Sequence, residues 1–452
     1  MRASRVTSLA ALMGLAVVFA CSSSSSPASG TDAGTVDAGA SPPAAGGTGA
    51  FGIITVNGKQ KMYLPQTSSL QDDAGNSDYV VAVVDVGAAG HGVGGAPALL
   101  RTVSLGTTAY ATTTGGDATM VVAASTQSND VWFIDPTTDT LVKHITLDPS
   151  YGQSGFSGGG GYVTGIAADP ATHTAILSVW NGFALVDLAT QSITKVIQAP
   201  PSENFGYDSV HQRVLAPFYD CTQSVNADGG VPTTCGTPTG PDGGVMGAGL
   251  SVIDLKDDTV YTYQDPGAAD PLNPLGTEPD SAAADPVSQA YVVPGEGDFE
   301  NVLDFSKAAF DKAGKTVTAP HVTVHGFALE GVAVEASTHV AFFEGEGSGD
   351  VALLKLPEAV SGDQGFVSGT MPNLPGDAGA SFANIGDPHG IAVTTSILGD
   401  APVGFLVDSG FRWVARVDLR ALAALEQSGT TVMAGTTQME AAVTFLDATT
   451  PE

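Results

Sequence analysis

A short pattern that recurs along the chain constrains the fold more than any other feature of the sequence. Apolar runs of strand length end in an aspartate that opens a turn, as in VWFID, FALVD, LSVID and RVDL. Further Val, Ile, Tyr and Phe runs surround each of them, separated by Gly, Pro, Asp and Asn. No long segment with a 3.6-residue apolar period follows residue 50. The pattern predicts an all-β domain built from repeated units.

The unit that is easiest to delimit covers residues 162–197 and reads as four strands, YVTGIAAD, HTAILSV, GFALVDL and SITKVI. Four-stranded units suit the blades of a β-propeller, because a closed ring of blades protects its sheet edges, and about seven would fit. We therefore expect a β-propeller domain over residues 51–450, with an insertion loop at 219–248. The terminal AAVTFLD (441–447) is expected to complete the first blade. Each third-strand aspartate is expected to accept turn amides and to need no further role.

Two stretches resemble the YVTN and NHL-like propeller repeats of bacterial surface proteins. They are GIAADPATHTAILSVWNGFALVDLATQSITKVI and DVWFIDPTTDTLVKHI. The resemblance covers most of residues 100–425. It implies a fold more than an activity.

Residues 1–20 read as an export signal. Arg2 and Arg5 precede an apolar run, residues 9–20, that is too short to span a bilayer. The run ends Val18-Phe19-Ala20-Cys21, which resembles the lipobox of bacterial lipoproteins. That resemblance implies an acylated Cys21 and membrane attachment, whereas the alternative is an ordinary signal peptide followed by a chance cysteine.

Residues 21–50 are rich in Ser, Gly, Ala and Pro and predict a flexible linker between the lipidated cysteine and the propeller. We therefore expect an exported lipoprotein at the outer membrane or cell surface, with the periplasmic face as an alternative. Cys221 and Cys235 share one polar loop, so an oxidising compartment favours a disulfide between them. Free thiols or a metal-binding pair are the alternatives.

The charge balance excludes one class of partner. The chain carries 47 Asp and Glu against 16 Lys and Arg, a formal net charge of −31. Such a charge repels phosphate backbones, so nucleic acid is not an expected partner. The apolar share of 43% is large enough for a sizeable core, and we expect a monomer.

The long connections of the expected propeller gather on one face. In a blade, connections between the second and third strands and connections to the next blade leave on the same side. That side receives residues 150–161, 264–279, 357–388 and the insertion loop, while the opposite side receives tight turns, with 305–315 as an exception. Long loops often carry function, which makes the first side the candidate surface for a protein, glycan or small-molecule ligand.

Three residues stand where innermost strands begin on that side: Asp280, Glu330 and His389. Their placement resembles that of the metal ligands of gluconolactonase and regucalcin propellers, which implies a divalent ion at the channel mouth. The alternative is a set of hydrogen-bonded residues over channel water.

Two neighbouring hairpins repeat an acid-Gly-acid spacing, with candidate ligands at Glu296, Asp298, Glu344, Glu346 and Asp350. Carboxylates on Gly-rich loops suit Ca²⁺, and the alternative is a solvated acidic loop without a ligand. Trp180 and Asn181 occupy another hairpin tip and are candidates for stacking on a sugar, against a role in blade packing.

These features favour a binding or scaffolding module over an enzyme, because no nucleophile and base occur in a recognisable catalytic motif. Calcium is the candidate cofactor. The alternative function is a metal-dependent hydrolase of the lactonase type, with metal-bound water as nucleophile.

Overall fold

The computed structural model divides into two compact units, residues 1–39 and 40–452. The structure describes residues of the second unit between 51 and 447. Gaps in this description fall at 67–69, 72–76, 87–97, 152–162, 180–181, 201, 203, 219–248, 266–274, 276–278, 280, 296–298, 326–328, 330, 346–348, 364, 375–390, 396–401 and 408–412.

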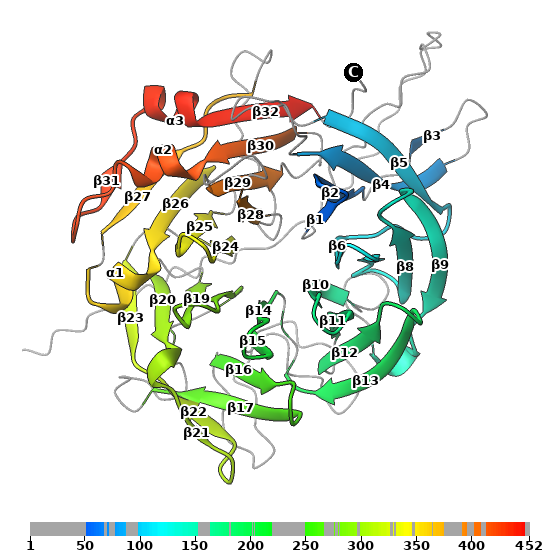
Figure 1. Cartoon of the computed structure of the whole chain (residues 1–452), viewed down its shortest axis with the longest axis horizontal. Helices are drawn as coiled ribbons and strands as arrows, with labels where there is room; N and C mark the ends of the chain where they lie inside the picture. The colour runs from blue at the N-terminus through cyan, green and yellow to red at the C-terminus, as the bar shows by residue number, and fades with distance from the viewer. Residues whose placement is uncertain are drawn as a thin grey trace, which may run out of the picture. The chain divides into compact units, whose positions relative to one another are not determined.

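The described residues form seven antiparallel sheets arranged in a ring, a seven-bladed β-propeller (Figure 1). The predicted fold class is therefore confirmed. In each blade the four main strands follow one another from the channel outward, each antiparallel to the one before.

The first three blades lie within residues 52–198. Blade 1 contains β1 (Gly52–Val56), β2 (Lys59–Pro65), β4 (Ser77–Asp85) and β5 (Ala98–Gly106), with β3 (Leu70–Gln71) beside β4. Blade 2 contains β6 (Thr113–Gly116), β7 (Val121–Ala124), β8 (Asp130–Asp135) and β9 (Thr140–Thr146). Blade 3 contains β10 (Val163–Asp169), β11 (Thr174–Val179), β12 (Gly182–Asp187) and β13 (Ser192–Gln198).

The remaining four blades follow the same order. Blade 4 contains β14 (Gly206–Asp208), β15 (Arg213–Phe218), β16 (Gly249–Asp254) and β17 (Thr259–Gln264). Blade 5 contains β18 (Ala283–Asp285), β19 (Ala290–Gly295), β20 (Phe299–Asp304) and β23 (His321–His325). Blade 6 contains β24 (Gly331–Glu335), β25 (Val340–Glu344), β26 (Asp350–Lys355) and β27 (Phe366–Thr370). Blade 7 contains β28 (Ile391–Thr395), β29 (Pro402–Val407), β30 (Trp413–Asp418) and β32 (Val443–Asp447).

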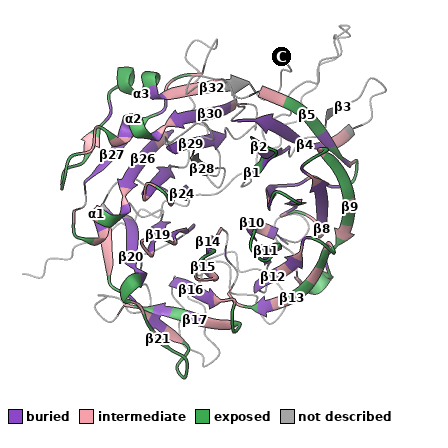
Figure 2. Ribbon diagram, in the orientation of Figure 1, coloured by how far each residue is buried: buried purple, intermediate pink, exposed green. Residues whose placement is uncertain are grey.

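Seven apolar clusters hold the ring together, one between each pair of neighbouring blades. They arise because successive side chains of a strand point to opposite faces of its sheet. On β2, Tyr63 packs toward blade 2 while Met62 and Leu64 pack toward blade 7. The middle strands are consequently buried on both faces, and outer strands such as β5 and β9 carry the exposed residues (Figure 2).

The ring closes without an exchanged strand, so the expectation that 441–447 completes the first blade is wrong. β32 pairs with β30 and is the outer strand of blade 7 itself. Blade 1 instead takes its outer strand from β5, which pairs with β4. Side-chain packing joins the first and last blades, with Met62 and Leu64 against Val403 and Phe405.

Connections between third and fourth strands are longer in blades 5 to 7 than the sequence predicted. Blade 5 inserts a 3₁₀ turn (Phe305–Lys307), β21 (Ala309–Asp311) and β22 (Thr316–Thr318), blade 6 inserts α1 (Leu356–Val360), and blade 7 inserts α2 (Leu419–Ala423), β31 (Val432–Met433) and α3 (Thr436–Ala442). β22 adds in parallel to β17 of blade 4, and β31 adds in parallel to β27 of blade 6. The range 357–388, predicted to be one loop, therefore contains part of α1 and the whole of β27.

These insertions cover the outer edge of the preceding blade, including β20 and β23, against which α1 packs. A second 3₁₀ turn, Pro149–Tyr151, follows β9. Within the described ranges, no helix has the length and apolar character needed to cross a membrane.

Glycines allow the innermost strands to approach one another closely. A Cβ atom on Gly206 of β14 would lie 2.9 Å from the carbonyl oxygen of Ala282, next to β18. A Cβ on Gly115 of β6 would lie 2.7 Å from Cγ2 of Ile166 on β10. Any larger residue would push these blades apart at the channel.

The turn role predicted for the third-strand aspartates is confirmed. Asp135 accepts a hydrogen bond from the amide of Thr137 at 2.7 Å, and Asp187 accepts one from the amide of Thr190 at 2.7 Å. Asp418 caps α2 in the same way, through the amides of Arg420 and Ala421. These carboxylates shape their turns, as short polar side chains commonly do.

Candidate functional site

The direction of the strands gives the propeller two unlike faces. We call the side where innermost strands begin the loop face and the side where they end the turn face. Counted between strands that follow one another directly along the chain, the four longest connections belong to the loop face and fall at 147–162, 219–248, 265–282 and 371–390. The turn face carries the insertions at 305–320 and 419–442, which contain short strands and helices of their own. Four-residue turns belong to the turn face, at 170–173, 209–212, 286–289 and 336–339 after innermost strands and at 136–139, 188–191 and 255–258 after third strands.

Both ends of the ring lie on the loop face. Phe51, which is buried in the cluster between blades 1 and 7, immediately precedes the innermost strand β1. The outer strand β32 runs from the turn face and ends at Asp447. The turn face is therefore the side of the propeller opposite to the point where residues 1–50 join it.

Most of the sequence-predicted site residues lie outside the described residues. They are Cys21, Trp180, Asn181, Cys221, Cys235, Asp280, Glu296, Asp298, Glu330, Glu346 and His389. The lipid anchor, the disulfide, the sugar contact and the metal centre at the channel mouth therefore stay predictions. The hydrolase alternative depends on that same metal centre and stays a prediction too.

The structure does place two of the candidate calcium ligands, Glu344 and Asp350. Glu344 at the end of β25 pairs with Val351 and is fully buried. Asp350 is the next residue to Val351 along β26, so its side chain points to the opposite face of the sheet. It accepts a hydrogen bond from Oγ1 of Thr370 at 2.6 Å. The two carboxylates therefore do not converge on one point.

Among the described residues, no group of three or more His, Cys, Asp or Glu side chains is arranged to hold a metal ion. The calcium prediction for this hairpin accordingly stays a prediction that depends on residues outside the described ranges.

Sequence reasoning overlooked Glu300, the last residue of the first acidic hairpin. It is 3% exposed and borders a cavity of about 10 Å³ between blades 5 and 6. Apolar residues make up the rest of the lining, among them Val324, Leu329, Phe343 and Leu354. The space is close to what a single water molecule needs, so the cavity does not suit a larger ligand.

A polar network that the sequence analysis also overlooked lies on the turn face. Innermost strands of blades 3 to 6 end in an acid, and all four of these acids are buried: Asp169, Asp208, Asp285 and Glu335. Each accepts hydrogen bonds from amides of the following turn, such as Val287 to Asp285 at 3.0 Å and Thr338 to Glu335 at 2.8 Å. Burial strengthens these bonds and makes the loss of a partner costly.

The last residue of each of these turns has a positive φ. The values are 52° for His173, 55° for Gln212, 57° for Gln289 and 58° for His339. This left-handed conformation is unusual for residues other than Gly, Asn and Asp. The hydrogen bonds to the buried acid at the start of each turn stabilise this conformation.

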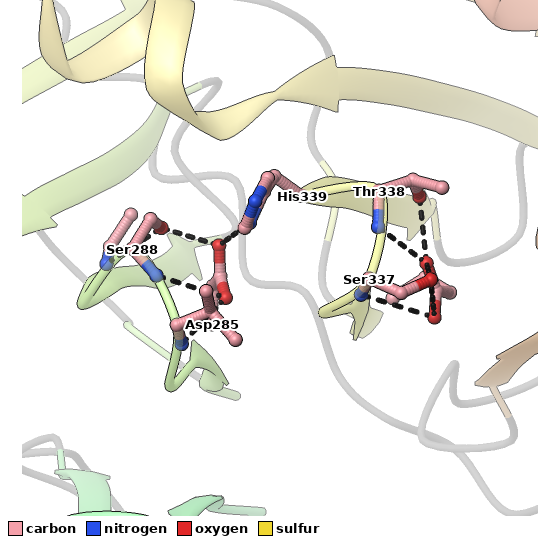
Figure 3. A network of polar contacts seen from close by, with 8 residues as sticks. Asp285, Ser288, Ser337, Thr338 and His339 are labelled. Atoms are coloured by element: carbon pink, nitrogen blue, oxygen red, sulfur yellow. Dashed lines mark hydrogen bonds and ion pairs between the residues drawn. The ribbon is translucent and has the colours of Figure 1, made fainter.

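Asp208, Asp285 and Asp117, which opens the corresponding turn of blade 2, also bind the next blade around the ring, always in the same direction. Asp117 of blade 2 accepts from Nδ1 of His173 in blade 3 at 2.7 Å. Asp285 of blade 5 accepts from Nδ1 of His339 in blade 6 at 2.6 Å (Figure 3). In blade 4, Asp208 accepts from the hydroxyl of a blade 5 residue, Tyr291.

These buried contacts shift the pKa values of several groups that form them. Burial alone would raise the pKa of Asp117, but hydrogen bonds from Thr119, His173 and Met120 outweigh it and hold the pKa below its usual range. Burial, and then the carboxylate of Asp208, raise the pKa of Tyr291. Burial and Asp169 of blade 3 similarly raise the pKa of Tyr207 in blade 4. These groups form structural contacts between blades.

A second set of contacts joins the blades at their outer edges. Arg101 of β5 donates to the carbonyl of Thr138 in blade 2 at 2.8 Å. Lys143 of β9 donates to the carbonyl of Gln191 in blade 3 at 2.7 Å. Lys195 of β13 pairs with Asp258 in blade 4. Each cation thus reaches the turn after the third strand of the following blade.

These three cations also occupy equivalent positions in their strands. A register shift follows the pairs Val83 with Arg101, Phe133 with Lys143, and Leu185 with Lys195. Each outer strand therefore has one extra residue beside the cation. Such bulges twist an exposed edge and charged side chains discourage its pairing with another chain.

An Asp followed four residues later by His or Gln is the sequence pattern that could have indicated the turn-face network. It is present at Asp169 to His173 and Asp285 to Gln289. The sequence alone does not reveal which neighbouring blade each acid contacts, because that depends on the order of the blades around the ring.

No protein-family model matches the chain, and no curated protein matches it either. Many solved structures match, among them hydrazine synthase from Kuenenia stuttgartiensis. That match has a TM-score of 0.42 and 10% sequence identity and covers 92% of this chain and 99% of that one. A complex of KlAtg21 with the coiled coil of AgAtg16 matches with a TM-score of 0.43 and 7% identity, covering 75% of this chain and 90% of that one. At this similarity neither match carries an argument about function.

Proposed function

We propose that this protein is an exported, lipid-anchored β-propeller that binds a partner or ligand through its loop face. The four longest connections between directly consecutive strands lie on one face, and this placement carries the proposal. Long loops on a rigid scaffold are a common way to build a binding surface, because the scaffold holds the loops while their sequences vary. The ligand is a protein, glycan or small molecule, with Ca²⁺ as a candidate ion.

The anchor follows from the resemblance of Val18-Phe19-Ala20-Cys21 to a lipobox. A linker of 29 residues, Ser22 to Ala50, would connect Cys21 to the ring. A Gly- and Ser-rich chain of this length has a mean reach of about 30 Å. The ring begins on the loop face, so the linker would enter the propeller on the side of the proposed binding surface.

Metabolic labelling with a fatty acid tests the anchor. We expect label on the wild-type chain and none on Cys21→Ala. Equal labelling of the two chains would contradict the anchor without affecting the binding proposal.

Site-specific photo-crosslinking in the native cells tests the binding surface. A benzophenone amino acid is placed at Thr222 in the longest loop-face connection, and a matched one replaces Thr194 on the outer edge of blade 3. We expect a discrete crosslinked product from position 222 and none from position 194. The same products from both positions, or none from either, would contradict a role for the loop face.

A further inference from the structure

The turns after the innermost strands of four consecutive blades lie around the channel on the turn face and contain no charged residue. These turns read PATH at 170–173, SVHQ at 209–212, PVSQ at 286–289 and ASTH at 336–339. None of them contains Asp, Glu, Lys or Arg, although the chain has 47 acidic and 16 basic residues. We call this set of four turns the turn crown.

Two valines at equivalent positions give the turn crown exposed apolar side chains. Val210 of blade 4 is 62% exposed and Val287 of blade 5 is 66% exposed, more than any other large apolar side chain of the described residues. Their blades are neighbours, since β14 and β18 are in contact. Exposed apolar side chains on neighbouring turns that contain no charged residue suit the centre of a protein interface, where charged residues are depleted.

The turn crown is held rigid by the buried acids beneath it. Asp208 accepts from the amides of Val210 and His211, and Asp285 accepts from those of Val287 and Ser288. Both acids are inaccessible to solvent, so their charges do not appear on the crown itself. A rigid surface loses little conformational entropy on binding, which favours association.

Two further observations define what could bind. The first innermost strand, β1, begins on the loop face, whereas the turn crown lies on the turn face. The net charge of −31 attracts cations at long range and repels a second copy of the same chain.

We propose that the turn crown is a second interaction surface, separate from the loop face, and that it binds a protein segment presenting apolar side chains flanked by Lys or Arg. The apolar side chains contact Val210 and Val287. The flanking cations are attracted by the negative field of the propeller, which raises the rate of association.

Titration calorimetry with an amphipathic leucine-lysine peptide tests this proposal on the full chain. The double variant Val210→Ser, Val287→Ser is compared with Val142→Ser, which replaces a valine of 47% exposure on the outer edge of blade 2. We expect the double variant to bind at least about tenfold more weakly, and Val142→Ser to bind like the wild type. Both replacements are at exposed positions, so all the chains should fold.

Three results would overturn the proposal. The first is no binding of the leucine-lysine peptide to the wild type. The second is equal affinity of the double variant and the wild type. The third is equal binding of a lysine-only peptide of the same length and charge, which would show that charge alone accounts for the interaction. None of these outcomes bears on the anchor or on the loop face.

Discussion

The carboxylate of Asp285, at the end of the innermost strand of blade 5, accepts a hydrogen bond from Nδ1 of His339 in the first turn of blade 6 at 2.6 Å. Asp285 is fully buried and also accepts from the amides of its own turn, at Val287 and Ser288. One side chain therefore shapes a turn and joins two blades.

Replacing this acid should weaken the propeller markedly. We expect Asp285→Asn to lower the free energy of unfolding by about 2 to 4 kcal/mol, because it leaves buried donors without a charged acceptor. Urea unfolding monitored by tryptophan fluorescence measures the change.

Asp187→Asn is the matched control, because Asp187 accepts hydrogen bonds from Thr190 in its own exposed turn. We expect it to cost about 1 kcal/mol or less. Equal losses in the two variants would show that the contact with His339 adds nothing to the stability of the ring.

The histidine side of the contact can be tested with a residue that the protein already uses. Gln occupies the equivalent turn position in blades 4 and 5, as Gln212 and Gln289. We expect His339→Gln to keep the positive φ and to lose only the bond to Asp285, at a cost of about 1 kcal/mol. A loss as large as that of Asp285→Asn would instead indicate that the turn itself has changed.

The cations on the outer strands should protect the protein from association. We expect the triple variant Arg101→Val, Lys143→Val, Lys195→Val to form soluble aggregates, because it removes charge from the edges of three neighbouring blades. Dynamic light scattering over several hours measures this.

Lys307→Val is a suitable control because Lys307 is 66% exposed but lies on a 3₁₀ turn away from these edges. We expect it to stay monomeric. Comparable aggregation of the control would point to lost solubility rather than to exposed edges.

Much of the fold could be predicted from the sequence because a blade is a local unit. The four strands of blade 3 follow one another with turns of two to four residues, so their apolar runs are visible as a group. The turn function of Asp187 could be predicted for the same reason, since its partner Thr190 is three residues away.

Contacts between distant residues were not predictable in this way. β22 and β31 are two or three residues long and depend on the outer strands of preceding blades for their pairing. The terminal strand β32 has the same alternation whether it joins blade 7 or blade 1, so sequence could not choose between them. His173 and His339 likewise lie more than fifty residues from the acids that they bind.

The packing between blades 6 and 7 should be intolerant of a single methyl group. A Cβ on Gly404 of β29 would lie 2.5 Å from Cε1 of Phe342, which is fully buried on β25. We expect Gly404→Ala to destabilise the protein by about 1 to 3 kcal/mol, because a packed core does not yield easily. Thermal unfolding measures the loss.

A second variant identifies the cause. Phe342→Leu removes the aromatic edge, so the cost of Gly404→Ala should be smaller in that background than in the wild type. Gly435→Ala, where the nearest atom is Oε1 of Gln438 at 3.5 Å, should cost less than about 1 kcal/mol. Simple additivity of the Gly404 and Phe342 changes would contradict the steric explanation.

Acid should unfold the propeller partly through Asp117, whose pKa is held below its usual range by bonds from Thr119, His173 and Met120. A carboxyl whose pKa is lowered by folding contributes stability above the pKa of the unfolded chain, about 4, and loses it as the pH falls through the folded value. We expect the urea midpoint of the wild type to fall between pH 5 and pH 3.

In Asp117→Asn this fall of the urea midpoint should be smaller, and the stability at pH 5 should be lower than in the wild type. Glu440→Gln on the exposed surface should follow the wild type. If Asp117→Asn lost stability over this range as steeply as the wild type, other carboxylates would have to account for the acid sensitivity.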